Sequence, residues 1–221
     1  MMASPMMDST CGPFFFGFFL QMCTPSAEYP RSDAPKSIRF TGGLLNGTKE
    51  GMSENLTWWN EVVDNPTKDI VFVCQGTVSP NYADTVIPTM ESLEDRPNTV
   101  LIVALGVRGA TLNSSIPVPN NVPIIDYLPF NDILPYSSVF VTNGGYGSFQ
   151  HCISNGTPMV VAGSGEDKPE ICARTEWAGV VSISRRAHRQ VKLSELRLMR
   201  FLLTRSNSYM KMNVNLYLSS A

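Results

Sequence analysis

The residues best suited to chemistry form a glycine-rich turn, Asn143-Gly144-Gly145-Tyr146-Gly147-Ser148. The apolar run Val139 to Thr142 before it predicts a buried strand. Phe149 to Ser154 can form a helix after it, which Asn155-Gly156 would end. Such a turn exposes backbone N–H groups at a helix N-terminus, where free donors and the helix dipole favour an anion. The turn therefore predicts a phosphate site; a tight turn that serves packing alone is the alternative.

A second strand, loop and helix follow the turn directly. Pro158 to Ala162 reads as a buried strand, Gly163 to Gly165 as a loop, and Asp167-Lys168-Pro169-Glu170 as the start of a helix. Ligands of open α/β sheets bind at the carboxyl ends of the strands. We therefore expect one end of a phosphate-bearing ligand at Gly144–Ser148 and its other end near Gly163–Lys168.

The elements that must position these loops can be read upstream. Asp69 to Cys74 predicts the first strand of the domain, Asn81 to Leu93 a crossover helix and Thr99 to Leu105 a second strand. Residues Pro119 to Ile125 lead into a third strand. The pattern predicts an α/β fold: a Rossmann-like parallel sheet with helices on both faces. A G-x-G-x-x-G turn is absent after Cys74, which disfavours a nicotinamide-dependent dehydrogenase.

In their order and spacing, four motifs resemble the donor-binding half of the UDP-glycosyltransferases, nucleotide-sugar glycosyltransferases of the GT-B fold. The motifs are Asn143-Gly144-Gly145-Tyr146-Gly147-Ser148, Gly163-Ser164-Gly165, Glu166-Asp167-Lys168-Pro169-Glu170 and Trp177-Ala178-Gly179. The resemblance extends from about Ile38 to Ile183. It implies that the chain is a single C-terminal half of a GT-B fold.

The resemblance also implies a set of donor-binding residues. Those expected at the diphosphate are Gly76, Thr77, Asn143, Gly144, Gly145, Gly147 and Ser148. Those expected at uracil and ribose are Tyr127, Phe130 and Gln150, and those at the sugar are Asp167 and Lys168. The alternatives are that Tyr127 and Phe130 pack in the core, and that Asp167 serves as a helix cap.

Two positions depart from the family pattern. Asn143 stands where many members have a histidine that contacts the diphosphate; it can still donate a hydrogen bond but carries no charge. His151 stands where some members have a ribose-binding glutamate, so no ligand role is carried over to it, and ribose contact is expected to shift to Gln150 or to weaken.

The family transfers a sugar from a UDP-sugar to an acceptor hydroxyl with inversion and without a metal. By resemblance this chain is a hexosyltransferase for a small lipophilic acceptor, with UDP-sugar as co-substrate and no other cofactor. The family's catalytic base belongs to an acceptor domain that is almost wholly missing before Tyr29, so no catalytic residue is assigned. We expect weak donor binding and poor transfer by the chain alone. A non-catalytic nucleotide-sugar-binding or interaction domain is the alternative.

Composition limits the other classes. The net charge is −2 with 16% charged residues, so no basic surface for nucleic acid is expected. Five scattered cysteines without a C-x-x-C pair disfavour a zinc site and suit a reducing compartment, so a cytoplasmic location is expected. Gly12 to Leu20 is apolar but short for a membrane span, and membrane association is not expected; a short anchor is the alternative. The predicted boundaries are an acceptor-domain remnant and linker at 1–37, the donor domain at 38–205 and a tail at 206–221.

Overall fold

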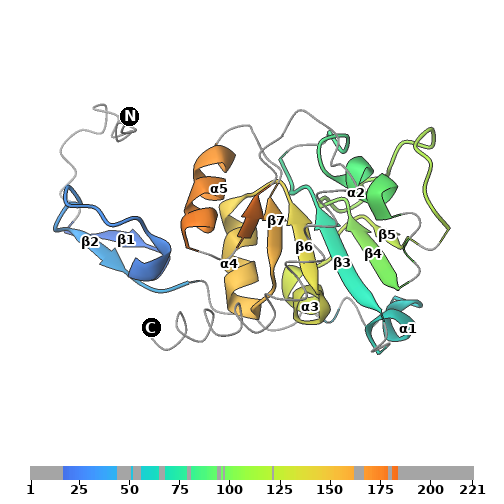
Figure 1. The fold of residues 1–221 in the computed structure, drawn as a ribbon, viewed down its shortest axis with the longest axis horizontal. Coiled ribbons are helices and arrows are strands. Elements are labelled where there is room, and N and C mark those ends of the chain that lie inside the picture. The colour runs from blue at the N-terminus through green and yellow to red at the C-terminus, as the bar shows by residue number, and fades with distance from the viewer. Residues whose placement is uncertain are drawn as a thin grey trace.

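The computed structural model describes residues 17–43, 51, 56–64, 68–78, 81–93, 96, 98–120, 122–161, 167–178 and 181–183. Strands and helices alternate along most of this length (Figure 1). The strands are β1 (Phe19–Gln21), β2 (Ile38–Phe40), β3 (Asp69–Cys74), β4 (Thr99–Ala104), β5 (Ile124–Ile125), β6 (Val139–Thr142), β7 (Met159–Val161) and β8 (Val181–Ile183). The α-helices are α1 (Trp59–Val63), α2 (Val86–Leu93), α3 (Phe130–Ile133), α4 (Tyr146–Asn155) and α5 (Lys168–Trp177), with short 3₁₀ turns at Pro25–Ala27 and Leu134–Tyr136.

Six strands form one sheet in the order β5-β4-β3-β6-β7-β8, and every neighbouring pair is parallel. The chain order runs outward in one direction from β3 to β5 and then in the other from β6 to β8. The order therefore reverses between β3 and β6, which pair directly from Val71↔Val139 to Cys74↔Thr142. This reversal is the switch point at which open α/β sheets bind ligands.

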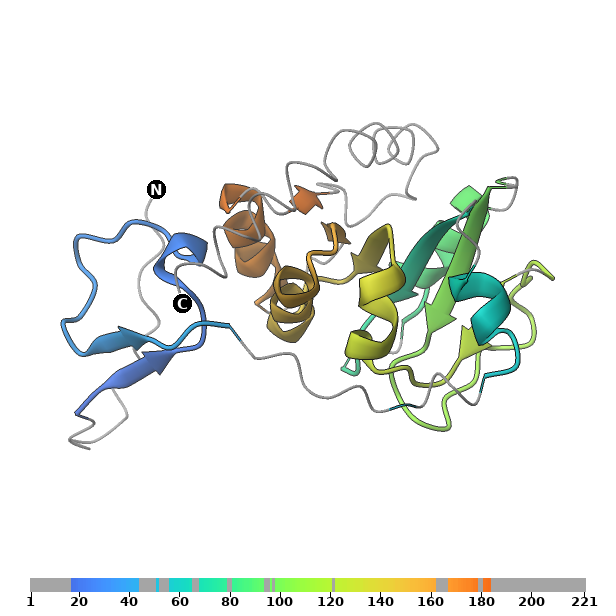
Figure 2. The same ribbon diagram turned by 90° about the horizontal axis from the view of Figure 1, so that it is seen from below.

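Buried side chains alternate between the two faces of the sheet. On one face, Ile70, Phe72 and Cys74 join a core cluster completed by residues of α1, α3, α4 and α5. On the other face, Val71 and Val73 pack with Val86 and Met90 of α2. Helices thus cover both faces, as Figure 2 shows from below, and the predicted α/β fold is confirmed.

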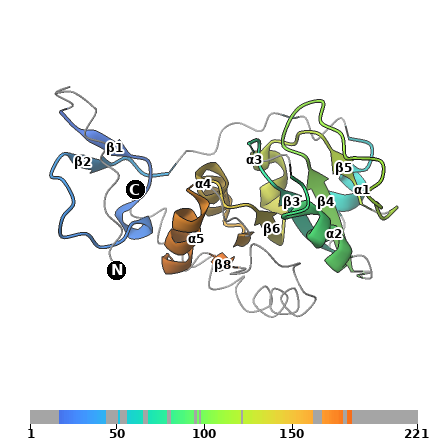
Figure 3. The ribbon, with the colours of Figure 1, turned by 90° about the horizontal axis from the view of Figure 1, so that it is seen from above.

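The N-terminal residues hold a structure that the sequence pattern did not predict. Residues 1–37 were expected to be a remnant and a linker, but Phe19–Gln21 pairs in parallel with Ile38–Phe40 as a separate two-stranded sheet. This small sheet lies beyond α4 and α5, apart from the main sheet (Figure 3). Cys23 and Ala27, from the segment between its strands, are buried in the same core cluster as α4 and α5.

Two helices begin at residues other than the predicted ones. Helix α4 starts at Tyr146, three residues before the expected start, because Gly147 adopts helical geometry despite its low helix propensity. It ends as predicted at Gly156, whose φ of +65° is the left-handed cap. Helix α2 starts only at Val86, which places Pro88 in its first turn, where proline is tolerated. No helix within the described part of the chain is long and apolar enough to cross a membrane.

Candidate functional site

The two loops at the switch point lie against each other. β3 ends at Cys74 and leads into Gly76, and β6 ends at Thr142 and leads into Asn143. A Cβ atom added to Gly76, whose φ is +91°, would lie 3.3 Å from Nδ2 of Asn143. Since Asn143 is buried, its amide stands at the point where the two strand ends meet. The structure therefore brings together the Gly76 loop and the Asn143 turn, two segments that the resemblance assigns to one diphosphate.

The turn after β6 presents a helix N-terminus that has no side-chain cap among the described residues. Gly144 has a φ of +89° and Gly145 is the N-cap of α4, so the backbone N–H groups from Gly145 to Ser148 lie in the first turn. Such groups have no partner within the helix, and the helix dipole adds positive potential there. The buried hydroxyl of Ser148 lies within the same turn and accepts a hydrogen bond of 3.3 Å from Thr142 Oγ1. This geometry suits an anion.

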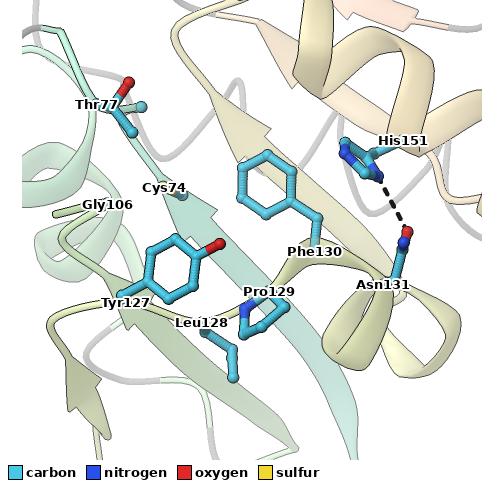
Figure 4. A pocket seen from close by; sticks show the side chains of 10 residues that line it. Cys74, Thr77, Gly106, Tyr127, Leu128, Pro129, Phe130, Asn131 and His151 are labelled. Atoms are coloured by element: carbon cyan, nitrogen blue, oxygen red, sulfur yellow. Dashed lines mark hydrogen bonds between the residues drawn. The ribbon is translucent and has the colours of Figure 1, made fainter. Parts of the chain in front are cut away.

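A hollow of about 240 Å³ opens beside these loops (Figure 4). Its walls come from the ends of β3 and β4, from the segment between β5 and α3, and from α4. The lining residues are Cys74, Gly76, Thr77, Gly106, Tyr127, Leu128, Pro129, Phe130, Asn131 and His151. Of the predicted residues, Gly76, Thr77, Tyr127 and Phe130 therefore share one pocket.

The two aromatic residues predicted at the base differ in their surroundings. Tyr127 is half-buried and turns its ring toward the hollow in Figure 4. Phe130 also borders the hollow, but its ring packs edge-to-face against Phe72 and Phe140, with centroid distances of 6.0 Å and 5.1 Å. Phe130 therefore supports the core as well as the pocket wall, while Tyr127 is the ring available for stacking.

His151, which sequence reasoning left without a ligand role, lines the pocket. Its Nδ1 lies 3.0 Å from Oδ1 of Asn131, and Figure 4 shows this contact at the pocket wall. Because that amide oxygen can only accept, Nδ1 carries the hydrogen, and Nε2 of a neutral ring is an acceptor. Burial lowers the pKa of His151, which favours the neutral form. A prediction that α4 starts at Tyr146 would have identified His151 as a pocket residue, because it then lies one helical turn after Gly147.

The lowered pKa of His151 makes stability depend on pH. As the pH falls through about 6.5, the unfolded chain binds a proton at this residue more readily than the folded chain, so the native state loses stability. We expect His151→Gln to reduce this loss. The measurement is the free energy of unfolding in urea at about pH 7.5 and about pH 5.5. An equal pH dependence in both proteins would contradict the assignment.

Gln150 lies outside the pocket, in contrast to the ribose contact predicted for it. Its side chain is 1% exposed, and Nε2 donates to the carbonyl oxygen of Met22 at 2.5 Å. The hydroxyl of Tyr146 donates to the same oxygen at 3.0 Å. A Cβ atom on Gly43 would lie 2.8 Å from Oε1 of Gln150. The amide therefore fastens the N-terminal segment to α4.

We expect Gln150→Leu to loosen residues 17–28 without disturbing the main sheet. The change removes one of the two donors to Met22, a loss of about 1 kcal/mol or about 5-fold in local opening. Hydrogen exchange measured by mass spectrometry should show faster exchange in peptides from this segment, with β3 as the internal control. Equal protection of the segment in both proteins would show that the amide does not hold it.

The two residues predicted at the sugar lie at the start of α5 and do not line this pocket. Asp167 is exposed at the N-cap position, and its carbonyl accepts from the N–H groups of Glu170 and Ile171 at 3.1 Å. Lys168 is 7% exposed. Asp167 therefore directly precedes the first residue of α5 and is exposed, and its predicted side-chain cap stays a prediction. Residues 162–166, which include Gly163–Gly165, lie outside the described residues.

Comparisons with known protein sequences match most of the chain. The family model for UDP-glucoronosyl and UDP-glucosyl transferases matches residues 19–189. UDP-glucosyltransferase 1 of Beauveria bassiana is 46% identical over 161 residues, which cover 73% of this chain and 35% of the relative. UDP-glucosyltransferase A1 of Starmerella bombicola is 39% identical over 162 residues, which cover 73% of this chain and 34% of the relative. The chain therefore spans about a third of the length of these curated relatives.

Solved structures of glycosyltransferases match most of this chain with about half of their own length. The glycosyltransferase of kitacinnamycin matches with a TM-score of 0.69 and 21% identity, over 91% of this chain and 51% of its own. The calicheamicin glycosyltransferase matches with a TM-score of 0.67 and 17% identity, over 92% and 49%. A spinosyn rhamnosyltransferase solved with thymidine diphosphate matches with a TM-score of 0.67 and 17% identity, over 90% and 52%. The fold is therefore that of about half of such an enzyme.

Proposed function

Because the chain belongs to the UDP-glucuronosyl and UDP-glucosyl transferase family and has the fold of the C-terminal half of a GT-B enzyme, we propose that it binds a UDP-sugar in the pocket at the switch point. The observation that carries the proposal is the meeting of three features at one sheet edge: the Gly76 loop, the N-terminus of α4 and the ring of Tyr127. An anion site beside a flat aromatic ring fits a nucleoside diphosphate.

Each part of the donor would meet a different wall of the site. The diphosphate would accept hydrogen bonds from the first-turn N–H groups of α4, with Asn143 and Thr77 beside it. The uracil would stack on Tyr127, and a ribose hydroxyl would donate to Nε2 of His151. The sugar would extend toward the exposed carboxylate of Asp167, with Lys168 next to it.

The reaction that this donor site would serve is hexose transfer to a hydroxyl of a small lipophilic acceptor, with inversion. The acceptor oxygen forms a bond to the anomeric carbon while the bond from that carbon to the diphosphate breaks. UDP leaves with the electron pair, and the proton passes to a base of an acceptor domain. The N–H groups of α4 would stabilise the charge that develops on the leaving diphosphate.

The proposed chemistry uses the UDP-sugar as co-substrate and no metal or other cofactor. The charge that a metal would neutralise is met in this account by the backbone donors of α4 and by the helix dipole. Among the described residues, no three His, Cys, Asp or Glu side chains cluster as metal ligands would. If the backbone donors of α4 neutralise the diphosphate without a metal, donor affinity should be the same with a chelator present as with added Mg²⁺.

A thermal-shift titration tests the proposed donor. UDP and UDP-glucose should raise the melting temperature of the purified chain, because a ligand that binds only the folded state stabilises it by RT ln(1 + [L]/Kd). NAD and ATP serve as controls, since NAD carries a diphosphate and ATP a triphosphate, and both have an adenine base in place of uracil. Equal shifts with all four would indicate a general anion site, and no shift with UDP in a chain that melts cooperatively would contradict the proposal.

A further inference from the structure

The ring of Tyr127 carries a cation over one of its faces. The guanidinium carbon of Arg108 lies 4.3 Å from the centre of this ring. Tyr127 is one of the residues that line the hollow, and Arg108 is not among them. The ring thus borders the hollow, while an exposed guanidinium group that is not part of the lining contacts it. A cation at this distance is attracted to the π-face of the ring.

A single carboxylate holds both partners of this pair. Oδ2 of Asp126 accepts a hydrogen bond of 2.6 Å from the N–H of Gly109, and Oδ1 accepts one of 2.7 Å from the N–H of Tyr127. The hydrogen bond from Gly109, followed by that from Tyr127, keeps the pKa of Asp126 below its ordinary value. Gly106 and Gly109, with φ of +89° and +78°, let the loop after β4 turn back toward Asp126. The loop that carries Arg108 is thus fixed relative to the ring.

The described lining of the pocket lacks the cationic side chain that Arg108 places nearby. Among the described residues that line the hollow there is no lysine or arginine, and burial lowers the pKa of its histidine, His151. Arg108 therefore brings positive charge to the base side of the pocket without entering it. A ring held by a cation on one face is ordered before a ligand stacks on the other face, which reduces the entropy lost on binding.

We propose that Arg108 is a positioning residue for base recognition: it holds the ring of Tyr127 so that a uracil base stacks on the opposite face. Asp126 completes the unit by fixing the loop of Arg108 to the backbone of Tyr127. This inference rests on the proposed function, because it requires a uridine nucleotide in the pocket. A cation–π contact at an exposed site corresponds to about 2- to 5-fold in affinity.

Calorimetric titration of the full chain with uridine, UDP and pyrophosphate tests the inference. Arg108→Met keeps the aliphatic stem and removes the charge, and Arg108→Lys restores a cation. Arg31→Met is the matched control, because it removes one exposed arginine that pairs with Asp33 instead of an aromatic ring. We expect Arg108→Met to weaken uridine and UDP by the same factor of about 2 to 5 and to leave pyrophosphate unaffected. Arg108→Lys should recover part of the loss.

A double-mutant cycle separates positioning from simple charge. In a Tyr127→Ala background, Arg108→Met should have no further effect on uridine or UDP. A loss that persists in this background, or one that weakens pyrophosphate equally, would show a long-range charge effect and overturn the inference. Tighter uridine binding by Arg108→Met would also overturn it, since Arg108 would then occupy the place of the base.

The same titrations distinguish this inference from the proposed function. If the unaltered chain binds pyrophosphate but not uridine or UDP, both base recognition and the role of Arg108 are refuted, and only the anion site at α4 stands. If it binds neither class of ligand, the proposed function fails as well. If it binds UDP but Arg108→Met behaves as Arg31→Met does, the donor site stands and the inference about Arg108 is wrong.

Discussion

Gly144→Ala is expected to destabilise the chain by about 2–6 kcal/mol and to abolish donor binding. The φ of +89° at this residue is costly for any residue with a side chain, and the new Cβ would lie 2.4 Å from Cγ1 of Val161 on β7. The new Cβ would also lie 3.3 Å from Sγ of Cys172 on α5, so moving away from Val161 does not relieve the crowding. The free energy of unfolding of a folded domain is about 5–15 kcal/mol in total, so a loss of this size should be evident in urea unfolding.

Gly145→Ala is the matched control for this experiment. The neighbouring residue has a φ of −64°, and a Cβ atom added there meets nothing within 4 Å. An alanine should therefore be accepted at position 145 with a change in unfolding free energy of less than about 1 kcal/mol. If the two variants were equally stable, the turn after β6 would not have the backbone described here, and the anion site would lose its structural basis.

Phe72→Ala is expected to cost about 3–5 kcal/mol and to weaken donor binding as well. The ring is fully buried at the centre of β3 and stacks on Phe140 of β6 with a centroid distance of 5.0 Å. It also supports the edge-to-face packing of Phe130, which borders the pocket. Removing it leaves a cavity beneath the pocket wall, so the loss of stability and the loss of UDP affinity should appear together.

Phe72→Leu distinguishes packing from a specific need for an aromatic ring. Leucine keeps most of the apolar surface buried and leaves a smaller cavity, so the cost should fall to about 1–2 kcal/mol. Urea unfolding gives the stability of each variant, and calorimetry gives its UDP affinity under conditions where it is folded. Full donor affinity in a folded Phe72→Ala protein would show that the pocket wall does not depend on the ring cluster.

Much of the sheet could be predicted because its strands are continuous apolar runs. Asp69–Cys74 and Val139–Thr142 were predicted with the bounds that the structure gives them, since strands covered on both faces contain few polar residues. The glycines at 76 and 144 were also informative, because both adopt a positive φ at the ends of these strands. Local sequence thus predicted the strands of the scaffold and the glycine turn between β6 and α4.

The features that could not be predicted depend on contacts between distant parts of the chain. The pairing of β1 with β2 joins residues about twenty positions apart, so no local pattern indicates it. Gln150 was expected at the ribose, but its amide contacts the carbonyl of Met22, which only the fold brings near. His151 was set aside because it differs from glutamate, although its ring nitrogen is also an acceptor.

The donor site proposed at the junction of β3 and β6 is tested by observing where UDP binds. Titration of the ¹⁵N-labelled chain, followed by NMR, should shift the amide signals of Gly76, Thr77 and Gly144 to Ser148 progressively until saturation. The amides of Tyr127 and His151 should move with the same affinity, since these residues line one pocket with Gly76 and Thr77. Shifts confined to residues outside this group, or none at high UDP concentration in a folded chain, would contradict a donor site at the junction of β3 and β6.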